Sequence, residues 1–192
     1  MSSSVRPPSR TEAQYPPSPY TYLPECASFD VTSTDVAEGV TLNPAQRSGK
    51  FGVPGGKDES PQLSWSGFPA DTKSFVVTCY DPDAPTVSGF WHWVCYDIPA
   101  SITSLPTNAG AEGGAGLPAG AKQVKNDAGF AGFLGAAPPS GHREHRYIFA
   151  VSAMPVETLP EAAATSASVC NFNMFGAGVL GRALLTAVYK EP

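Results

Sequence analysis

The sequence predicts a mostly β protein built around antiparallel strands, on three observations. The 192 residues include 20 Pro and 19 Gly, which favours many turns and few long helices. Runs rich in β-branched and aromatic residues recur along the chain, and turn-forming residues separate them, as in an antiparallel sandwich. We expect strands at residues 73–80, 90–96, 146–153 and 184–189. The helical signal is weak, and its best candidate spans about 172–184.

The chain divides into an N-terminal extension and one domain. Residues 1–24 contain six Pro, five Ser and several Tyr. A stretch so poor in core-forming residues is expected to be flexible or to lie extended on the surface. Tyr15, Tyr20 and Tyr22 are able to dock its later part on the body. Residues 25–192 then form a single domain, and the Ala/Gly-rich stretch 109–120 is expected to be a surface loop.

Composition excludes several classes of protein. Only 15% of residues are charged, the net charge is −5, and no Lys/Arg block appears, so nucleic-acid binding is not expected. Neither a signal-type apolar region nor a run of about 18 apolar residues is present, so we expect no integral membrane segment. Four cysteines without C-x-x-C spacing indicate free thiols in a cytoplasmic protein. A G-x-G-x-x-G match at 176–181 comes too late in the chain for a dinucleotide unit, so no cofactor is expected.

All three histidines fall within two short stretches, 81–93 and 138–147, among prolines, glycines and aromatics. Asp81 follows a predicted strand, and a carboxylate beside an imidazole orients the ring and raises its pKa. A purely structural interpretation is also possible for each motif. Residues 81–85 would then form an acidic turn, and His92 and His145 would be hydrogen-bonded core residues. His142 is expected to be a solvated loop residue, and His142-x-x-His145 alone is too weak a pattern to predict a metal site.

Strand alternation places some of these side chains. His92 is predicted to point away from the face that holds Trp91 and Trp93. His145 and Tyr147 stand two residues apart, so they are predicted to share one face. A strand start would therefore present an imidazole and a phenol together.

Four motifs in this order resemble the phosphatidylethanolamine-binding protein family, in particular its bacterial Raf-kinase-inhibitor-like branch. They are Ser60-Pro-Gln-Leu-Ser-Trp-Ser-Gly67, Asp81-Pro-Asp-Ala-Pro85, Gly89-Phe-Trp-His-Trp-Val94, and Pro138-Pro-Ser-Gly141 leading to His145-Arg-Tyr147. The resemblance spans roughly residues 28–189. It implies a central antiparallel β-sheet with a second smaller sheet and a few short helices. It also implies a homodimer and a cis peptide at Ala84–Pro85.

The resemblance further implies an anion-binding cavity at one end of the sheet, which in the family accepts phosphate or phosphoethanolamine head groups. Asp81 would repel a bare anion unless a histidine is protonated, so a zwitterionic or partly protonated ligand is expected. The implied ligand-binding residues are Asp81, Pro85, His92, Pro139, His145 and Tyr147.

Three functions stay open at this point. The first is a non-enzymatic binding protein for a small anionic or phosphorylated ligand, with a regulatory role as one version of it. The second is an enzyme, such as a cyclase or hydrolase, that uses Asp81, His92 and His145 as acid–base groups. The third is an inhibitor of a protease or kinase that acts through protein contacts. No dedicated nucleophile or metal site is visible in the sequence, which favours a binding protein over an enzyme.

Overall fold

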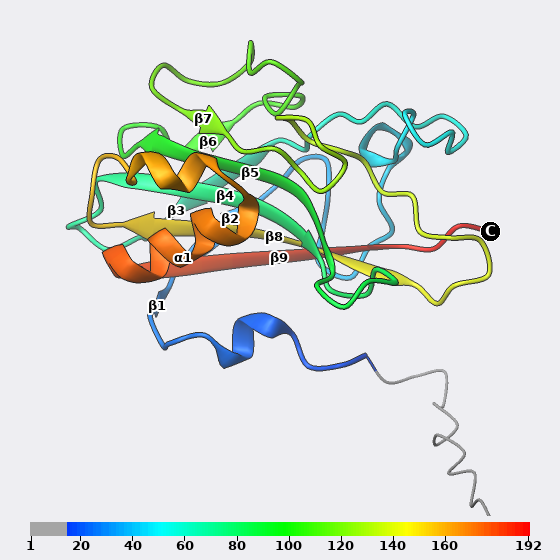
Figure 1. Ribbon diagram of the computed structural model, residues 1–192, viewed down its shortest axis with the longest axis horizontal. Coiled ribbons are helices and arrows are strands. Elements are labelled where there is room, and N and C mark those ends of the chain that lie inside the picture. Colours follow the sequence, from blue (N-terminus) through cyan, green and yellow to red (C-terminus); the bar gives the residue numbers. More distant parts are fainter. Residues whose placement is uncertain (1–14) are drawn as a thin grey trace, which may run out of the picture.

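The computed structural model describes residues 15–192, which form a large β-sheet covered on both faces (Figure 1). Within these residues the large sheet has the strand order β1-β9-β8-β4-β5-β7, and a smaller sheet has the order β2-β3-β6. All pairs are antiparallel except β1 with β9. The mostly β prediction, with a large and a smaller sheet, is confirmed. The strands are β1 Ala27–Ser28, β2 Asp30–Thr32, β3 Leu63–Ser66, β4 Ser74–Asp81, β5 Phe90–Pro99, β6 Ser104–Leu105, β7 Lys122–Gln123, β8 His145–Met154 and β9 Gly181–Tyr189.

The four predicted strands are the four long strands β4, β5, β8 and β9. Alternation along β4 explains why both of its faces are buried. Phe75 and Val77 point into a core shared with Leu63 and Trp65 of the smaller sheet, whereas Val76 points into a second core on the opposite face. The middle of the large sheet is therefore hydrophobic on both sides, which makes it a rigid support for the residues at its ends.

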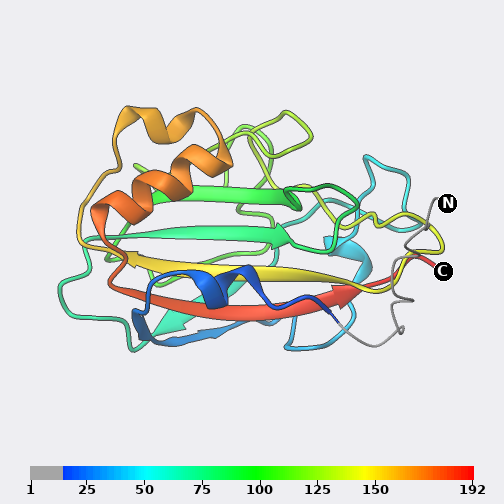
Figure 2. The same cartoon turned by 60° about the horizontal axis from the view of Figure 1, so that its bottom comes forward.

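The one α-helix among residues 15–192, α1 (Ala167–Ala177), packs on the second face beside the short 3-10 helix Glu161–Ala164 (Figure 2). The helix begins earlier and ends well before the predicted span of 172–184. Ser166 caps its start by accepting from the backbone N–H of Val169 at 3.2 Å. Gly178 ends it at φ 87°, a left-handed conformation that glycine adopts readily. Residues 181–184, which the helix prediction included, belong to β9 instead.

The described part of the N-terminal extension, residues 15–24, lies against the same face as α1. The hydroxyl groups of Tyr20 and Thr78 are 3.2 Å apart, and the Arg182 guanidinium lies over the Tyr20 ring. Tyr15 also contacts the body, whereas Tyr22 is 76% exposed. The docking predicted for these tyrosines is therefore confirmed for two of the three. Residues 1–14 lie outside the described residues, so the predicted flexibility of that part is not addressed.

The Ala/Gly-rich stretch is a surface loop except at its beginning. Ala109 and Gly110 are buried, and a Cβ on Gly110 would lie 2.7 Å from Cε2 of Trp93. Glycine is required there because the backbone packs directly on the indole. The prediction of a surface loop is thus wrong for these two residues and holds for the exposed positions that follow.

All four cysteines lie within the described residues and each is a free thiol. Three of them, Cys79, Cys95 and Cys170, are buried in the core. None of the helices among residues 15–192 is both long and apolar enough to span a membrane.

Candidate anion-binding site

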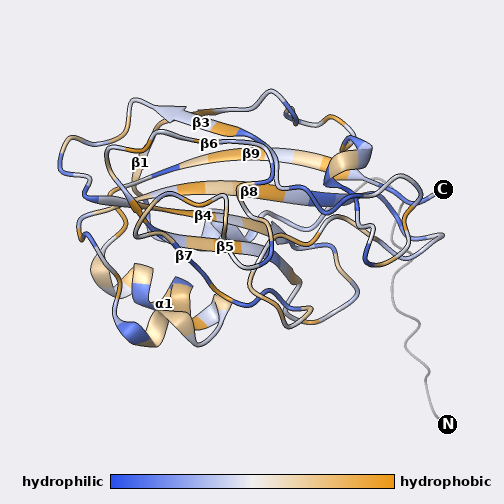
Figure 3. Ribbon diagram, turned by 90° about the horizontal axis from the view of Figure 1, so that it is seen from above, coloured by the Kyte–Doolittle hydropathy of each residue, from blue (hydrophilic) through white to orange (hydrophobic). Residues whose placement is uncertain are grey.

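The two histidine-containing stretches meet at one end of the large sheet, where β4 ends and β5 and β8 begin. β4 lies between β5 and β8, so Asp81 pairs with Phe90 while Tyr80 pairs with Ile148. Hydrophobic residues dominate the middle of β8, and its beginning is hydrophilic (Figure 3). Polar side chains therefore gather where the hydrophobic core stops.

An irregularity in β5 sets the direction of His92. Cys79 pairs with Trp93 and Tyr80 pairs with Trp91, so His92 is the extra residue of a β-bulge. Because of it, Trp93 packs in the core under the smaller sheet and Trp91 packs on the opposite face. The prediction that both tryptophans share one face, opposite His92, is wrong because regular alternation fails at the bulge. His92 lies edge-on to Tyr147, with the ring centroids 5.2 Å apart.

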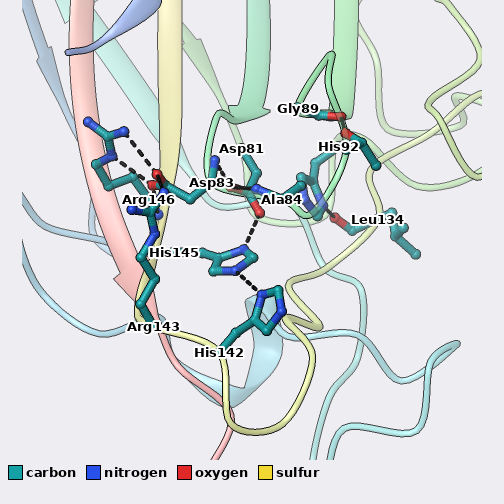
Figure 4. Close-up of polar contacts among 11 residues, drawn as sticks. Asp81, Asp83, Ala84, Gly89, His92, Leu134, His142, Arg143, His145 and Arg146 are labelled. Carbon is teal, nitrogen blue, oxygen red and sulfur yellow. Dashed lines mark hydrogen bonds and ion pairs between the residues drawn. The ribbon is translucent and has the colours of Figure 1, made fainter. Parts of the chain in front are cut away.

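Asp81 and His145 form a buried pair (Figure 4). Oδ2 of Asp81 lies 2.7 Å from Nδ1 of His145, and Oδ1 accepts from the backbone N–H groups of Asp83 and Ala84. An ionised carboxylate only accepts hydrogen bonds, so Nδ1 of His145 carries a proton. When His145 is neutral, its Nε2 is therefore an acceptor.

His92 is held in the same tautomer. Its Nδ1 lies 2.8 Å from the carbonyl oxygen of Leu134, which can only accept, so this nitrogen donates. Burial lowers the pKa of His92 below its ordinary value of 6.5, and the charge of Asp81 offsets this only in part. Near neutral pH, Nε2 of His92 is thus a second imidazole acceptor.

Tyr147 completes the group. It is 2% exposed, and its hydroxyl is buried without a hydrogen-bond partner among the described residues. Burial, reinforced by the charge of Asp81, raises the pKa of Tyr147 well above 10, so the phenol keeps its proton. Such an unpaired buried hydroxyl costs roughly 1–3 kcal/mol. The prediction that His145 and Tyr147 share a face is confirmed, since they occupy alternate buried positions of β8 with the less buried Arg146 between them.

His142 is part of this cluster, although the sequence suggested a solvated loop residue. Its ring is partly buried, and its Nδ1 lies 3.4 Å from Nε2 of His145. The chain Asp81–His145–His142 is visible in Figure 4. The two histidines thus contact each other, and no group of three or more His, Cys, Asp or Glu side chains suited to a metal occurs among residues 15–192. The spacing of three residues between His142 and His145 was the sequence feature that could have indicated this contact.

Asp83, two residues beyond Asp81, binds arginines instead. Its fully buried carboxylate accepts from Arg143 at 2.7 Å and from Nε and Nη2 of Arg146 at 2.7 and 3.0 Å. The backbone N–H of Arg146 adds a fourth bond at 3.1 Å. The sequence analysis did not predict these ion pairs. The pattern that could have indicated them is two arginines near His145 together with a second Asp in the 81–85 turn.

Residues 32–190 match the family described as phosphatidylethanolamine-binding protein. The chain belongs to this family. It is 45% identical to the UPF0098 protein YbcL of Escherichia coli over 170 residues, which cover 88% of this chain and 92% of that protein. It is 46% identical to E. coli YbhB over 135 residues, or 70% and 84% of the two chains. The crystal structure of E. coli YbcL matches with a TM-score of 0.81 and 44% identity, covering 86% of this chain and all of that one.

Two prolines named through the resemblance to the phosphatidylethanolamine-binding proteins lie at the margin of the cluster. Pro85 and Pro139 are exposed, and the carbonyl of Pro139 accepts from the backbone N–H of His142 at 3.0 Å. The expected cis peptide at Ala84–Pro85 is wrong, because every peptide bond among the described residues is trans. The side chain of Asp81 closes this turn instead, through its bonds to Asp83 and Ala84.

Proposed function

We propose that this member of the family binds a small oxyanion that still carries a proton, such as phosphate or the phosphate of a phosphoethanolamine-type head group. The observation that carries the proposal is the buried, unpartnered hydroxyl of Tyr147. A phenol with a raised pKa keeps its proton and can donate it in a hydrogen bond, so an oxyanion placed beside the hydroxyl removes the cost of the missing bond.

The histidines support a protonated oxyanion over a bare one. His92 and His145 both donate through Nδ1, to Leu134 and Asp81, so their Nε2 atoms accept when the rings are neutral. An acceptor nitrogen binds an O–H group, which a partly protonated phosphate has. Both carboxylate oxygens of Asp81 are already engaged. A proton on the ligand, donated to an imidazole Nε2, is therefore favoured over a ligand amine that binds the carboxylate of Asp81.

The test compares inorganic phosphate with phosphoethanolamine by isothermal titration between pH 5.5 and 8. A phosphate monoester loses its last proton near pH 6, whereas inorganic phosphate still carries one at pH 8. We expect the affinity for phosphoethanolamine to fall more steeply above pH 6 than the affinity for phosphate. Protonation of the histidines affects both ligands, so the difference isolates the proton of the ligand. Parallel pH profiles contradict this choice of ligand form.

Tyr147→Phe tests the donor directly. Loss of a hydrogen bond to a charged group, worth roughly 1.5–3 kcal/mol, should weaken phosphate binding about ten-fold or more. Tyr96→Phe is the matched control, because Tyr96 is also buried but lies toward the other end of β5. Equal affinities for the Tyr147 variant and the unmodified protein would remove the basis of the proposal.

An acid–base enzyme is the second candidate, and the 2.7 Å contact between Asp81 and His145 favours it. A carboxylate that holds Nδ1–H leaves Nε2 as a general base, with His92 as a further acid–base group. Turnover of 4-nitrophenyl phosphate that disappears in His145→Ala would support this candidate. Equal rates for the two proteins would contradict it for this substrate class.

The homodimer and the cytoplasmic location expected from the sequence stay proposals. Light scattering at micromolar concentration should give twice the mass of one chain, and a mass near 20 kDa would contradict the dimer.

A further inference from the structure

We propose that His142 is a direct ligand residue: its Nδ1–H leaves His145 and donates to the bound oxyanion. The inference rests on the proposed function and adds to it a specific donor, a residue that the sequence suggested was a bystander.

The hydrogen-bond pattern fixes which atom donates. Nδ1 of His145 gives its proton to Asp81, so the neutral ring has only a lone pair at Nε2. Nδ1 of His142 faces that lone pair at 3.4 Å. Two facing lone pairs would repel, so the proton between the rings belongs to His142. His142 therefore stands where a ligand O–H would meet His145.

The contact between the two rings is easily exchanged. Its length of 3.4 Å exceeds the usual 2.7–3.2 Å of such bonds. The backbone of His142 is anchored, because its N–H donates to the carbonyl of Pro139 at 3.0 Å in a turn where Gly141 has φ 79°. The ring is partly exposed, so a rotation about its side-chain bonds requires no change in the backbone turn.

The oxyanion needs this donor. The Nε2 atoms of His92 and His145 are acceptors, and an ionised carboxylate such as that of Asp81 has no proton to donate. Among these buried groups, only the hydroxyl of Tyr147 is a donor that no protein group already uses. On binding, the O–H of the ligand replaces His142 at Nε2 of His145, and the released Nδ1–H of His142 bonds a second ligand oxygen. One hydrogen bond is exchanged for two, and no proton is gained or lost.

The experiment measures phosphate affinity at pH 7 by isothermal titration for the unmodified protein and for His142→Ala, His142→Asn and Ser140→Ala. The amide nitrogen of Asn lies near the place of the imidazole Nδ1, so this variant keeps the donor and removes the ring. Ser140 belongs to the same turn, and its hydroxyl donates to the main-chain oxygen of Pro192 at 3.2 Å. Thermal unfolding of each variant separates a loss of fold from a loss of binding.

We expect His142→Ala to bind phosphate about ten-fold more weakly, His142→Asn to recover most of that loss, and Ser140→Ala to match the unmodified protein. Unchanged affinity in a folded His142→Ala overturns the role of His142 and leaves the anion site standing. Tighter binding in that variant also overturns it, because His142 would then only block His145. Absence of phosphate binding by the unmodified protein overturns the anion site itself.

Discussion

Asp81 and Asp83 belong to one turn and are both buried, but their surroundings differ. Asp83 accepts four hydrogen bonds, three of them from the guanidinium groups of Arg143 and Arg146. Asp81 accepts two backbone N–H groups and one imidazole. Arginine stays charged at every accessible pH, whereas the charge of an imidazole changes near neutrality. We call these two surroundings the arginine side and the histidine side.

The difference indicates that the two carboxylates of this turn have different roles, one in stability and one beside the candidate ligand site. On the arginine side, both oxygens of Asp83 accept from arginine groups, so that side holds β8 and the loop before it in place. On the histidine side, the hydroxyl of Tyr147 has no partner among the described residues, and Nε2 of His145 has only the long 3.4 Å contact with His142. The ion pairs that stabilise this end of the sheet thus lie beside the atoms that are available to a ligand.

The largest expected effect comes from Asp83→Asn. Removing one partner from a buried ion pair leaves charge without compensation, which costs roughly 3–5 kcal/mol. Arg143 and Arg146 are partly exposed and can reach water, so we expect a loss near the lower end, about 3 kcal/mol, measured by urea unfolding. Asp71→Asn, at an exposed position, should change stability by less than about 0.5 kcal/mol. A similar small change for Asp83 would show that the arginine side does not stabilise the fold.

Asp81→Asn should cost less stability and change the chemistry more. The amide oxygen still accepts the N–H groups of Asp83 and Ala84, so we expect a loss of about 1–2 kcal/mol. The amide N–H₂ now faces Nδ1 of His145, which must become the acceptor, and Nε2 takes the proton. Nitrogen-15 NMR of the imidazole should report this change of tautomer, and Asp83→Asn should leave the tautomer unchanged. The same tautomer in both variants would contradict the hydrogen-bond assignment.

Much of the fold was predictable from local patterns. β4, β5, β8 and β9 are rich in β-branched and aromatic residues and are bounded by Pro, Gly and Asp, so their positions follow from the sequence. The helix bounds were missed because glycines lie along the predicted span and the cap at Ser166 precedes it. The bulge at His92 was missed because it depends on pairing with β4, and no periodicity within β5 reveals it.

The site was predictable from spacing only in part. His145 and Tyr147 share a face because they are two residues apart on a strand. The contact of Asp81 with His145 depends on the pairing of β4 with β8, and it was expected only from the family resemblance. The roles of Asp83 and His142 were not predictable in this way. The role of Asp83 depends on a contact between its turn and Arg143, 60 residues away in the sequence. The role of His142 depends on the direction of its side chain, which the sequence pattern does not determine.

A smaller effect is expected from pH through His92. Burial lowers the pKa of its folded form below 6.5, the ordinary value in the unfolded chain. Below pH 6.5 the unfolded state then binds more protons, so this residue makes stability fall as the pH decreases. His92→Asn keeps a donor for Leu134 and removes the titration. Urea unfolding from pH 7 to 5 should therefore show a flatter pH dependence for the variant than for the unmodified protein. Identical slopes would mean that His92 is not held neutral by burial.

The smallest expected effect tests whether the two sides act independently. Tyr15 extends the arginine side: its hydroxyl donates to Glu144 at 2.9 Å, and the guanidinium of Arg146 lies 4.7 Å from its ring centroid. Exposed contacts of this kind are worth roughly 0.5–1 kcal/mol, so Tyr15→Ala should lower stability by about that amount and Tyr15→Phe by less. Neither variant should change phosphate affinity, because both leave the histidine side intact. A loss of affinity in Tyr15→Ala as large as that expected for His142→Ala would show that the arginine side also positions the ligand residues, and the division between the two sides would fail.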